Sequence, residues 1–163
     1  MDKTPTSRAE AVNQMTANRD AILPFFAVSA EVAARTYAPG KWTLRQVLIH
    51  IADSETVNFD RLRRLAAEDK PWLLAFDQDL WKQRLEYDRR DLALTGVLFN
   101  ATRAAAIDLV KVLTEAVDAR QGVHNEAGIR TFGEQIAICW RHAAHHLEQV
   151  RAAAGGRLWT PAG

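Results

Sequence analysis

Four long stretches of the chain carry apolar residues at the three- and four-residue spacing of an amphipathic helix. Their predicted bounds are Ser7 to Tyr37, Thr43 to Glu68, Arg90 to Ala119, and Thr131 to Ala154. No run of strand length alternates between apolar and polar residues, so the pattern predicts an all-α protein with essentially no sheet. Four helices of this length, joined by connections, indicate a four-helix bundle.

Residue types that favour helix ends support these bounds. Ser7 and Thr131 are each followed three residues later by a glutamate, as in a capping box, and Gly155 and Gly156 follow the last helix. Pro24 lies inside the first stretch and predicts a kink there. Residues 72–87 and residues 121–128 break the periodic pattern and are expected to be connections. The connection at residues 72–87 is expected to carry a short helix.

The composition is that of an ordinary globular domain. The 163 residues are 48% hydrophobic and 25% charged, and we expect residues 1–163 to form one domain with a sizeable core. Lys and Arg total 21 against 20 for Asp and Glu, which gives a net charge of +1. This balance provides no electrostatic basis for binding nucleic acid or an anionic membrane.

Other features narrow the class of protein. The single cysteine, Cys139, cannot form an intrachain disulfide, which excludes a disulfide-stapled secreted domain. Residues 1–5 lack the apolar segment of a signal peptide. Uninterrupted apolar stretches such as residues 22–28 are far shorter than the roughly 20 residues that span a bilayer. The default expectation is a cytoplasmic protein without a membrane segment.

Three of the five histidines lie close together, at positions 142, 145 and 146. An α-helix turns by about 100° per residue, so His142 and His146 lie one above the other. His146 lies within the predicted buried stripe and His142 borders it; the stripe consists of Phe132, Ile136, Cys139, Ala143 and Val150. His145 points away from that stripe. Two imidazoles at this spacing can chelate one metal ion, and they can equally be bundle residues satisfied by hydrogen bonds.

A third candidate ligand is His50, in an apolar part of the second predicted helix. Taken alone, a histidine in such surroundings is more often a core residue. A chelating pair on the last helix, however, needs a further ligand from a facing helix. His124 lies in a polar connection, where a solvated side chain is the simpler interpretation. The sequence therefore predicts a metal site of His50, His142 and His146.

Three neutral imidazoles leave coordination positions open for water or substrate, as in catalytic rather than structural sites. Histidine ligands suit zinc, nickel, iron or copper, and we expect one divalent ion, with zinc or nickel ahead of iron. Neither His-Glu-x-x-His nor the Glu-x-x-His pairs of diiron proteins surround these histidines. Five nearby polar residues are candidate hydrogen-bond partners of the ligands: Asp53, Ser54, Glu55, Glu148 and Gln149. Of these, Ser54 is best placed by helix rotation to share the face of His50.

Three segments together resemble the DinB-like superfamily, which includes the YfiT-type proteins. They read GKWTLRQVLIHIADSE (Gly40–Glu55), FDQDLW (Phe76–Trp81) and WRHAAHH (Trp140–His146). The resemblance covers nearly the whole chain, from the first helix to about residue 150. Each segment is a weak signal, but their order and spacing are fairly specific.

The resemblance implies a four-helix bundle with one mononuclear metal held by a histidine of the second helix and two of the last. Transferred to this chain, these ligands are again His50, His142 and His146. Many members carry a further histidine three positions after the final ligand, where this chain has Gln149. Members are described as metal-dependent hydrolases, and several relatives as thiol-dependent S-transferases or isomerases.

The resulting functional hypothesis is a metal-dependent hydrolase or thiol S-transferase in which the ion polarises a water or a low-molecular-weight thiol toward a small-molecule substrate. Cys139 lies in the apolar stripe and is expected to be a core residue rather than a nucleophile. No general base is assigned. The alternative is a non-catalytic bundle acting through self-association, and a homodimer is expected because five tryptophans provide large apolar area for an interface.

Overall fold

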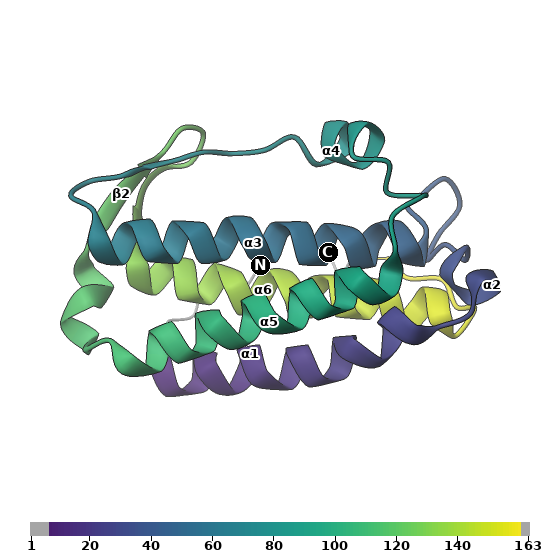
Figure 1. Cartoon of the computed structure of the whole chain (residues 1–163), viewed down its shortest axis with the longest axis horizontal. Helices are drawn as coiled ribbons and strands as arrows, with labels where there is room; N and C mark the ends of the chain where they lie inside the picture. Colours follow the sequence, from purple (N-terminus) through teal and green to yellow (C-terminus); the bar gives the residue numbers. More distant parts are fainter. Residues whose placement is uncertain (1–6, 161–163) are drawn as a thin grey trace.

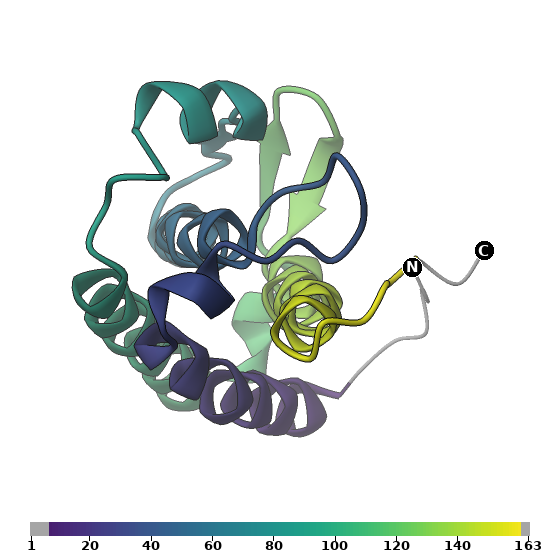
Figure 2. The same ribbon diagram turned by 90° about the vertical axis from the view of Figure 1, so that its right-hand side faces the viewer.

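The computed structural model of the chain describes residues 7–160, so the segment used above to argue against a signal peptide lies outside the described residues. Four long helices form the predicted bundle (Figure 1): α1 (Arg8–Ile22), α3 (Leu44–Ala67), α5 (Leu92–Val112) and α6 (Phe132–Ala154). In the view along the bundle axis, α3 packs against α5 and α6, and α1 packs against the same two helices (Figure 2). The four-helix bundle is therefore confirmed.

Helices α3 and α5 run in the same direction, so the chain returns along the bundle between them (Figure 1). Residues 68–91 make this return and contain strand β1 (Trp72–Leu73) and helix α4 (Gln78–Arg84). The Asp77 side chain caps α4 by accepting hydrogen bonds from two backbone N–H groups. The predicted loop with a short helix is confirmed, and it places α4 against α3.

Side-chain caps set the ends of the long helices. Thr43 and Thr131 cap α3 and α6 in capping boxes, in which the side chain three residues later bonds back to the cap residue. Ser7 caps α1 through its hydroxyl. Gly156 adopts a φ of 64° directly after α6, the left-handed conformation that closes a helix and that glycine adopts without strain. These predicted helix ends are confirmed.

The first predicted helix is broken rather than kinked. Helix α1 ends at Ile22, and a 3-10 helix, η1 (Leu23–Ala27), follows with Pro24 in its first turn. Proline has no N–H to continue the α-helical ladder, so the tighter turn takes over. Ser29 then caps a separate short helix, α2 (Ala30–Ala33). The prediction of one continuous element to residue 37 was wrong.

The prediction of essentially no sheet was also wrong. The predicted third helix ends seven residues early, at Val112, and a 3-10 helix, η2 (Glu115–Ala119), follows it. Beyond it lie the antiparallel strands β2 (Gln121–His124) and β3 (Gly128–Thr131), and β1 pairs in parallel with β2 to complete a three-stranded sheet. Strands of two and four residues are too short for alternation to reveal them.

The core has two apolar clusters separated by buried polar residues. One cluster includes Phe26 and Phe99, whose rings stack with centroids 5.7 Å apart. Gly96 permits this contact, since a Cβ there would lie 2.8 Å from the Phe26 Cβ. The other cluster includes Leu62 and Phe132. Polar side chains of α1, α3, α5 and α6 are buried as well: Asn18, His50, Glu55, Asn58, Arg103 and Gln135.

Helix α5 is long and apolar enough to cross a membrane by length and composition, with a mean hydropathy of 1.3 over its most apolar window. The sequence of α5 shows no uninterrupted apolar run because Arg103, Asp108 and Lys111 interrupt it. In this structure α5 packs along α3 and α1 and contributes Phe99 to the core.

Candidate metal centre

The structure brings together the three histidines that the sequence singles out. His50 lies in the second turn of α3 and is 2% exposed, on the face that packs against α6. His142 and His146 are half-buried on α6, one turn apart, where the i, i+4 spacing places both rings on the same side. One nitrogen from each of the three rings lies within 4.8 Å of the other two.

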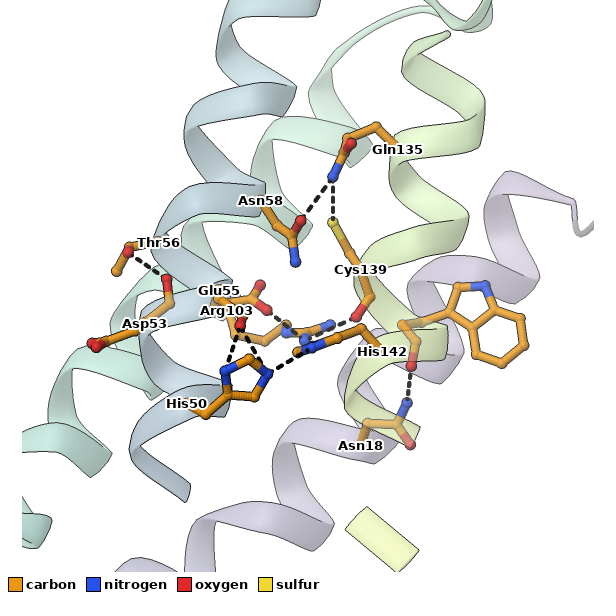
Figure 3. Close-up of polar contacts among 12 residues, drawn as sticks. Asn18, His50, Asp53, Glu55, Thr56, Asn58, Arg103, Gln135, Cys139 and His142 are labelled. Atoms are coloured by element: carbon orange, nitrogen blue, oxygen red, sulfur yellow. Dashed lines mark hydrogen bonds and ion pairs between the residues drawn. The ribbon is translucent and has the colours of Figure 1, made fainter. Parts of the chain in front are cut away.

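The geometry within the cluster matches that of a small coordination sphere. The Nε2 atoms of His50 and His142 are 3.1 Å apart and point toward each other (Figure 3). Ligand nitrogens around a tetrahedral zinc ion lie roughly 3.3 Å apart, given Zn–N bonds of about 2.0–2.1 Å. The centroid of the His146 ring is 4.8 Å from that of His50 and 4.5 Å from that of His142.

Burial keeps these imidazoles neutral, which is the form that binds a metal. Desolvation lowers the pKa of His50 to about 4. Desolvation, helped by the neighbouring His50, lowers the pKa of His146 to about 3. The pKa of His142 is lowered well below its usual value, first by desolvation and then by the adjacent histidines. All three rings therefore have a free lone pair at neutral pH.

Hydrogen bonds orient two of the rings. The Oε1 atom of Gln149 lies 2.7 Å from Nδ1 of His146. The hydroxyl of Ser54 lies within 3.4 Å of both ring nitrogens of His50, on the face predicted from helix rotation. The Gln149 contact fixes both the orientation and the tautomer of the His146 ring, whereas the Ser54 hydroxyl holds the His50 ring without selecting a tautomer. Glu148 is exposed and pairs with Arg151, so it takes no part in the cluster.

His145 lies outside the cluster. Its ring packs edge-on against His146 and against Trp159, in both cases with centroids 5.1 Å apart. The Nε2 atom of His145 lies 3.3 Å from Nε2 of Gln149, which can donate to it. His124 also lies outside the cluster, at the end of β2. Its Nδ1 accepts hydrogen bonds from backbone N–H groups in the turn between β2 and β3.

Carboxylates near the cluster already have partners. Asp53 accepts hydrogen bonds from the Tyr87 hydroxyl, at 2.8 Å, and from the Arg90 guanidinium, at 2.7 Å. Glu55 forms a buried ion pair with Arg103, with Oε2 and Nη2 2.6 Å apart, next to His50 and His142 (Figure 3). Neither carboxylate belongs to the group of side chains that can hold one ion.

Arg103 went unnoticed in the sequence, although it is fully buried and contacts the ligand helix by donating to the Cys139 carbonyl at 3.2 Å. The only sequence feature that could have indicated its burial is its position as a lone arginine within the alanine-rich segment 101–106. Cys139 is buried, and burial raises the pKa of its thiol to about 12, which makes it an inert core residue as predicted.

Aromatic side chains surround His50. The Trp42 ring packs edge-on against it with centroids 5.3 Å apart. Phe76, from the connection before α4, lies 6.2 Å from the His50 ring and 4.4 Å from the Trp81 ring, centroid to centroid. The connection between α3 and α5 therefore contributes part of the wall of the site.

Comparison with known proteins identifies the family. The family model described as DinB superfamily matches residues 3–150. The chain belongs to the DinB superfamily. This DinB protein is 27% identical over 124 residues to a protein of Oceanobacillus iheyensis named "Putative metal-dependent hydrolase", a match that covers 76% of the chain and 72% of the relative. Bacillus subtilis YfiT, which carries the same name, is 24% identical over 115 residues, covering 70% and 65%.

The fold of this DinB protein also matches a solved structure. Bacillus subtilis YfiT, described as "a probable metal-dependent hydrolase with an unusual four-helix bundle topology", superposes with a TM-score of 0.84 at 19% identity. The match covers 96% of this chain and 92% of that structure. The parallel pair α3 and α5, with its long return connection, thus belongs to a known bundle topology.

Proposed function

We propose that this DinB protein is a metal-dependent enzyme whose centre is formed by His50, His142 and His146. One observation carries the proposal: three buried or half-buried imidazoles from two facing helices place a nitrogen each within 4.8 Å of the others. Three neutral nitrogen donors suit zinc or nickel best, with iron also compatible. The names of the relatives as metal-dependent hydrolases point the same way.

Three protein ligands leave at least one coordination position open, as catalytic sites do. A divalent ion there supplies Lewis acidity, which lowers the pKa of a coordinated water or thiol toward neutrality. The chain itself provides orientation and exclusion of water. Gln149 and Ser54 orient the rings of His146 and His50, and the aromatic rings of Trp42 and Phe76 cover His50.

The nucleophile can be water, which gives a hydrolase, or a low-molecular-weight thiol, which gives an S-transferase. A water nucleophile calls for a general base. Asp53 is engaged by Tyr87 and Arg90, and Glu55 is paired with Arg103 through Oε2, while the buried Oε1 of Glu55 has no hydrogen-bond partner among the described residues. A thiol ionises at a much lower pKa than water and needs less assistance from a base. In either case the substrate is a small molecule.

Metal content tests the proposal directly. Purified protein should carry about one equivalent of divalent metal by elemental analysis. His50→Ala, His142→Ala and His146→Ala should each lose most of it, whereas the matched control His145→Ala should keep it, since that ring faces Trp159. Loss in His145→Ala together with retention in His142→Ala would overturn the assignment. A substrate screen with and without added thiols then separates hydrolase from transferase.

A non-catalytic role through self-association is the second candidate, and exposed apolar residues on α5 favour it. Leu94, Val97 and Val112 are 68%, 65% and 68% exposed. Such residues suit an interface between two copies of the chain, so we propose a homodimer. The cytoplasmic location stays a prediction from the sequence. Light scattering after gel filtration measures the oligomeric state. A protein that dimerises through α5 and binds no metal would favour this role over the enzyme.

A further inference from the structure

A cavity of about 760 Å³ lies beside the histidine cluster, between α3 and the connection that follows it. Small-molecule sites occupy roughly 300–1,000 Å³, so its size suits a metabolite. None of the three histidines lines it, but Phe76 does, and Phe76 also packs against His50. The cavity and the histidine cluster are therefore adjacent, and the Phe76 side chain lies between them.

Among the described residues, one cation that lines this cavity, Arg61, forms no ion pair, although the carboxylates of Asp60 and Glu126 act on it at longer range. Of the lining carboxylates, Asp60 pairs with Arg64 at 2.7 Å, and Asp77 is used as the cap of α4. Arg61 also lines the cavity, and among the described residues no carboxylate pairs with it. Its Nη2 donates to the Leu74 carbonyl, and its buried Nε has no hydrogen-bond partner.

The rest of the wall is largely apolar and includes three aromatic side chains. Trp72, Phe76 and Trp81 all face the cavity, and the rings of the last two are in contact. Aromatic faces favour an apolar or aromatic ligand body. An unpaired guanidinium favours a planar anion that accepts two parallel hydrogen bonds, the geometry of a carboxylate.

Helix geometry aligns Arg61 with the histidine cluster. His50 and Arg61 are eleven residues apart on α3, which places them about 20° apart around the helix and roughly 16 Å apart along it. Long side chains on a helix lean toward its N-terminus, so the Arg61 guanidinium leans toward His50. A ligand held at Arg61 can therefore extend along α3 toward Phe76.

We propose that this cavity binds a small molecule with a carboxylate at one end and an apolar, preferably aromatic, body. Arg61 binds the carboxylate, the body packs against Trp72 and Phe76, and the far end points to the histidine cluster. Only this last orientation rests on the proposed function. The cavity thereby assigns a substrate class, aryl or alkyl carboxylates, to the neighbouring metal centre.

Titration of the full chain with 6-phenylhexanoate and its neutral amide tests carboxylate recognition. Affinities and the shifts of the tryptophan indole N–H signals are followed by NMR. A charge-assisted contact predicts that the acid binds at least about tenfold more tightly than the amide, with shifts of the Trp72 and Trp81 signals. Equal affinities of acid and amide, or indole signals that stay in place, would overturn the proposal.

Substitutions locate the contact. Arg61→Gln should abolish the preference for the acid, and Arg61→Lys should keep part of it. Arg63→Gln is the matched control, since Arg63 is exposed on the same helix and does not line the cavity, and it should keep the full preference. An unchanged preference in Arg61→Gln would overturn the role of this residue.

The orientation is tested separately with cobalt(II)-loaded protein. The phenyl protons of the bound acid should show larger paramagnetic shifts than the methylene protons beside the carboxylate. The reverse order would overturn the orientation. Failure of the metal centre appears instead as absence of bound cobalt. The comparison of acid with amide is repeated on chelator-treated protein and does not depend on the metal.

Discussion

The Oε1 atom of Gln149 lies 2.7 Å from Nδ1 of His146. An amide oxygen only accepts hydrogen bonds, so Nδ1 of His146 carries the ring proton and Nε2 keeps its lone pair. The ring is thereby fixed in the tautomer that can coordinate a metal through Nε2. Gln149 thus has an orienting role three positions after the last of the three histidines.

Replacement of Gln149 should weaken metal binding without abolishing it. Gln149→Leu removes the acceptor for Nδ1 and should lower the metal affinity by about 10- to 100-fold. Gln149→Glu keeps an acceptor oxygen and should stay close to the wild type. Competition with a chromophoric chelator measures the affinity. Glu148→Gln is the control, because that side chain is exposed on the same turn. An unchanged affinity in Gln149→Leu would exclude the orienting role.

Removal of the metal should lower the melting temperature without unfolding the protein. An ion held by His50 and the two histidines of α6 cross-links α3 and α6 in the native state only, so its binding free energy adds to stability. The two apolar clusters hold the bundle together without it. Thermal unfolding followed by circular dichroism with and without chelator gives the difference. Identical curves on protein shown to be metal-loaded would count against the site.

The sequence predicted those features that depend on local geometry. Helical spacing places His142 and His146 on one side of α6 and His145 on another whatever the tertiary structure. Capping residues such as Thr43 and Thr131 act within four residues of themselves. His50 required one further step, the assumption that α3 faces α6, and the contact between these helices confirms that assumption.

Features that depend on distant contacts were not predictable. Arg103 meets Glu55 across 48 positions of sequence, and neither residue shows from its neighbours that it is buried. Strands β1 and β2 pair over a separation of about 50 residues, too long for a turn signal to reveal. The cavity depends on how the connection before α4 lies along α3. Nothing in the local sequence therefore distinguishes its lining residue Arg61 from a surface charge.

The metal-free protein should lose stability as the pH falls below about 6.5. An unfolded histidine takes up a proton near that pH, whereas burial lowers the pKa of His50 to about 4 and that of His146 to about 3 in the folded chain. The unfolded state therefore binds more protons, and the free energy of unfolding falls by about 1.4 kcal/mol per pH unit for each such histidine. This loss runs from about pH 6.5 down to the folded pKa values.

Urea denaturation of chelator-treated protein between pH 8 and pH 4.5 measures this dependence. Ionisable groups elsewhere also titrate at acid pH, so the informative quantity is the difference between wild type and a variant. His50→Leu should have a shallower loss of stability between pH 6.5 and pH 4.5. Parallel curves for the two proteins would show that His50 is not held neutral by the fold.

Breaking the buried ion pair should destabilise the protein strongly. Arg103→Met leaves Glu55 without a partner in a site where burial already raises the pKa of its carboxyl, and loss of one member of a buried pair costs about 3–5 kcal/mol. The double variant Glu55→Leu with Arg103→Met removes both charges and should recover most of that loss. Arg151→Met breaks the exposed pair with Glu148 and should cost less than about 1 kcal/mol. Chemical denaturation of the wild type, Glu55→Leu, Arg103→Met and the double variant gives the coupling energy of the pair, with Arg151→Met measured alongside as the exposed control. A double variant no more stable than Arg103→Met would show that the pair's net effect is packing rather than charge compensation.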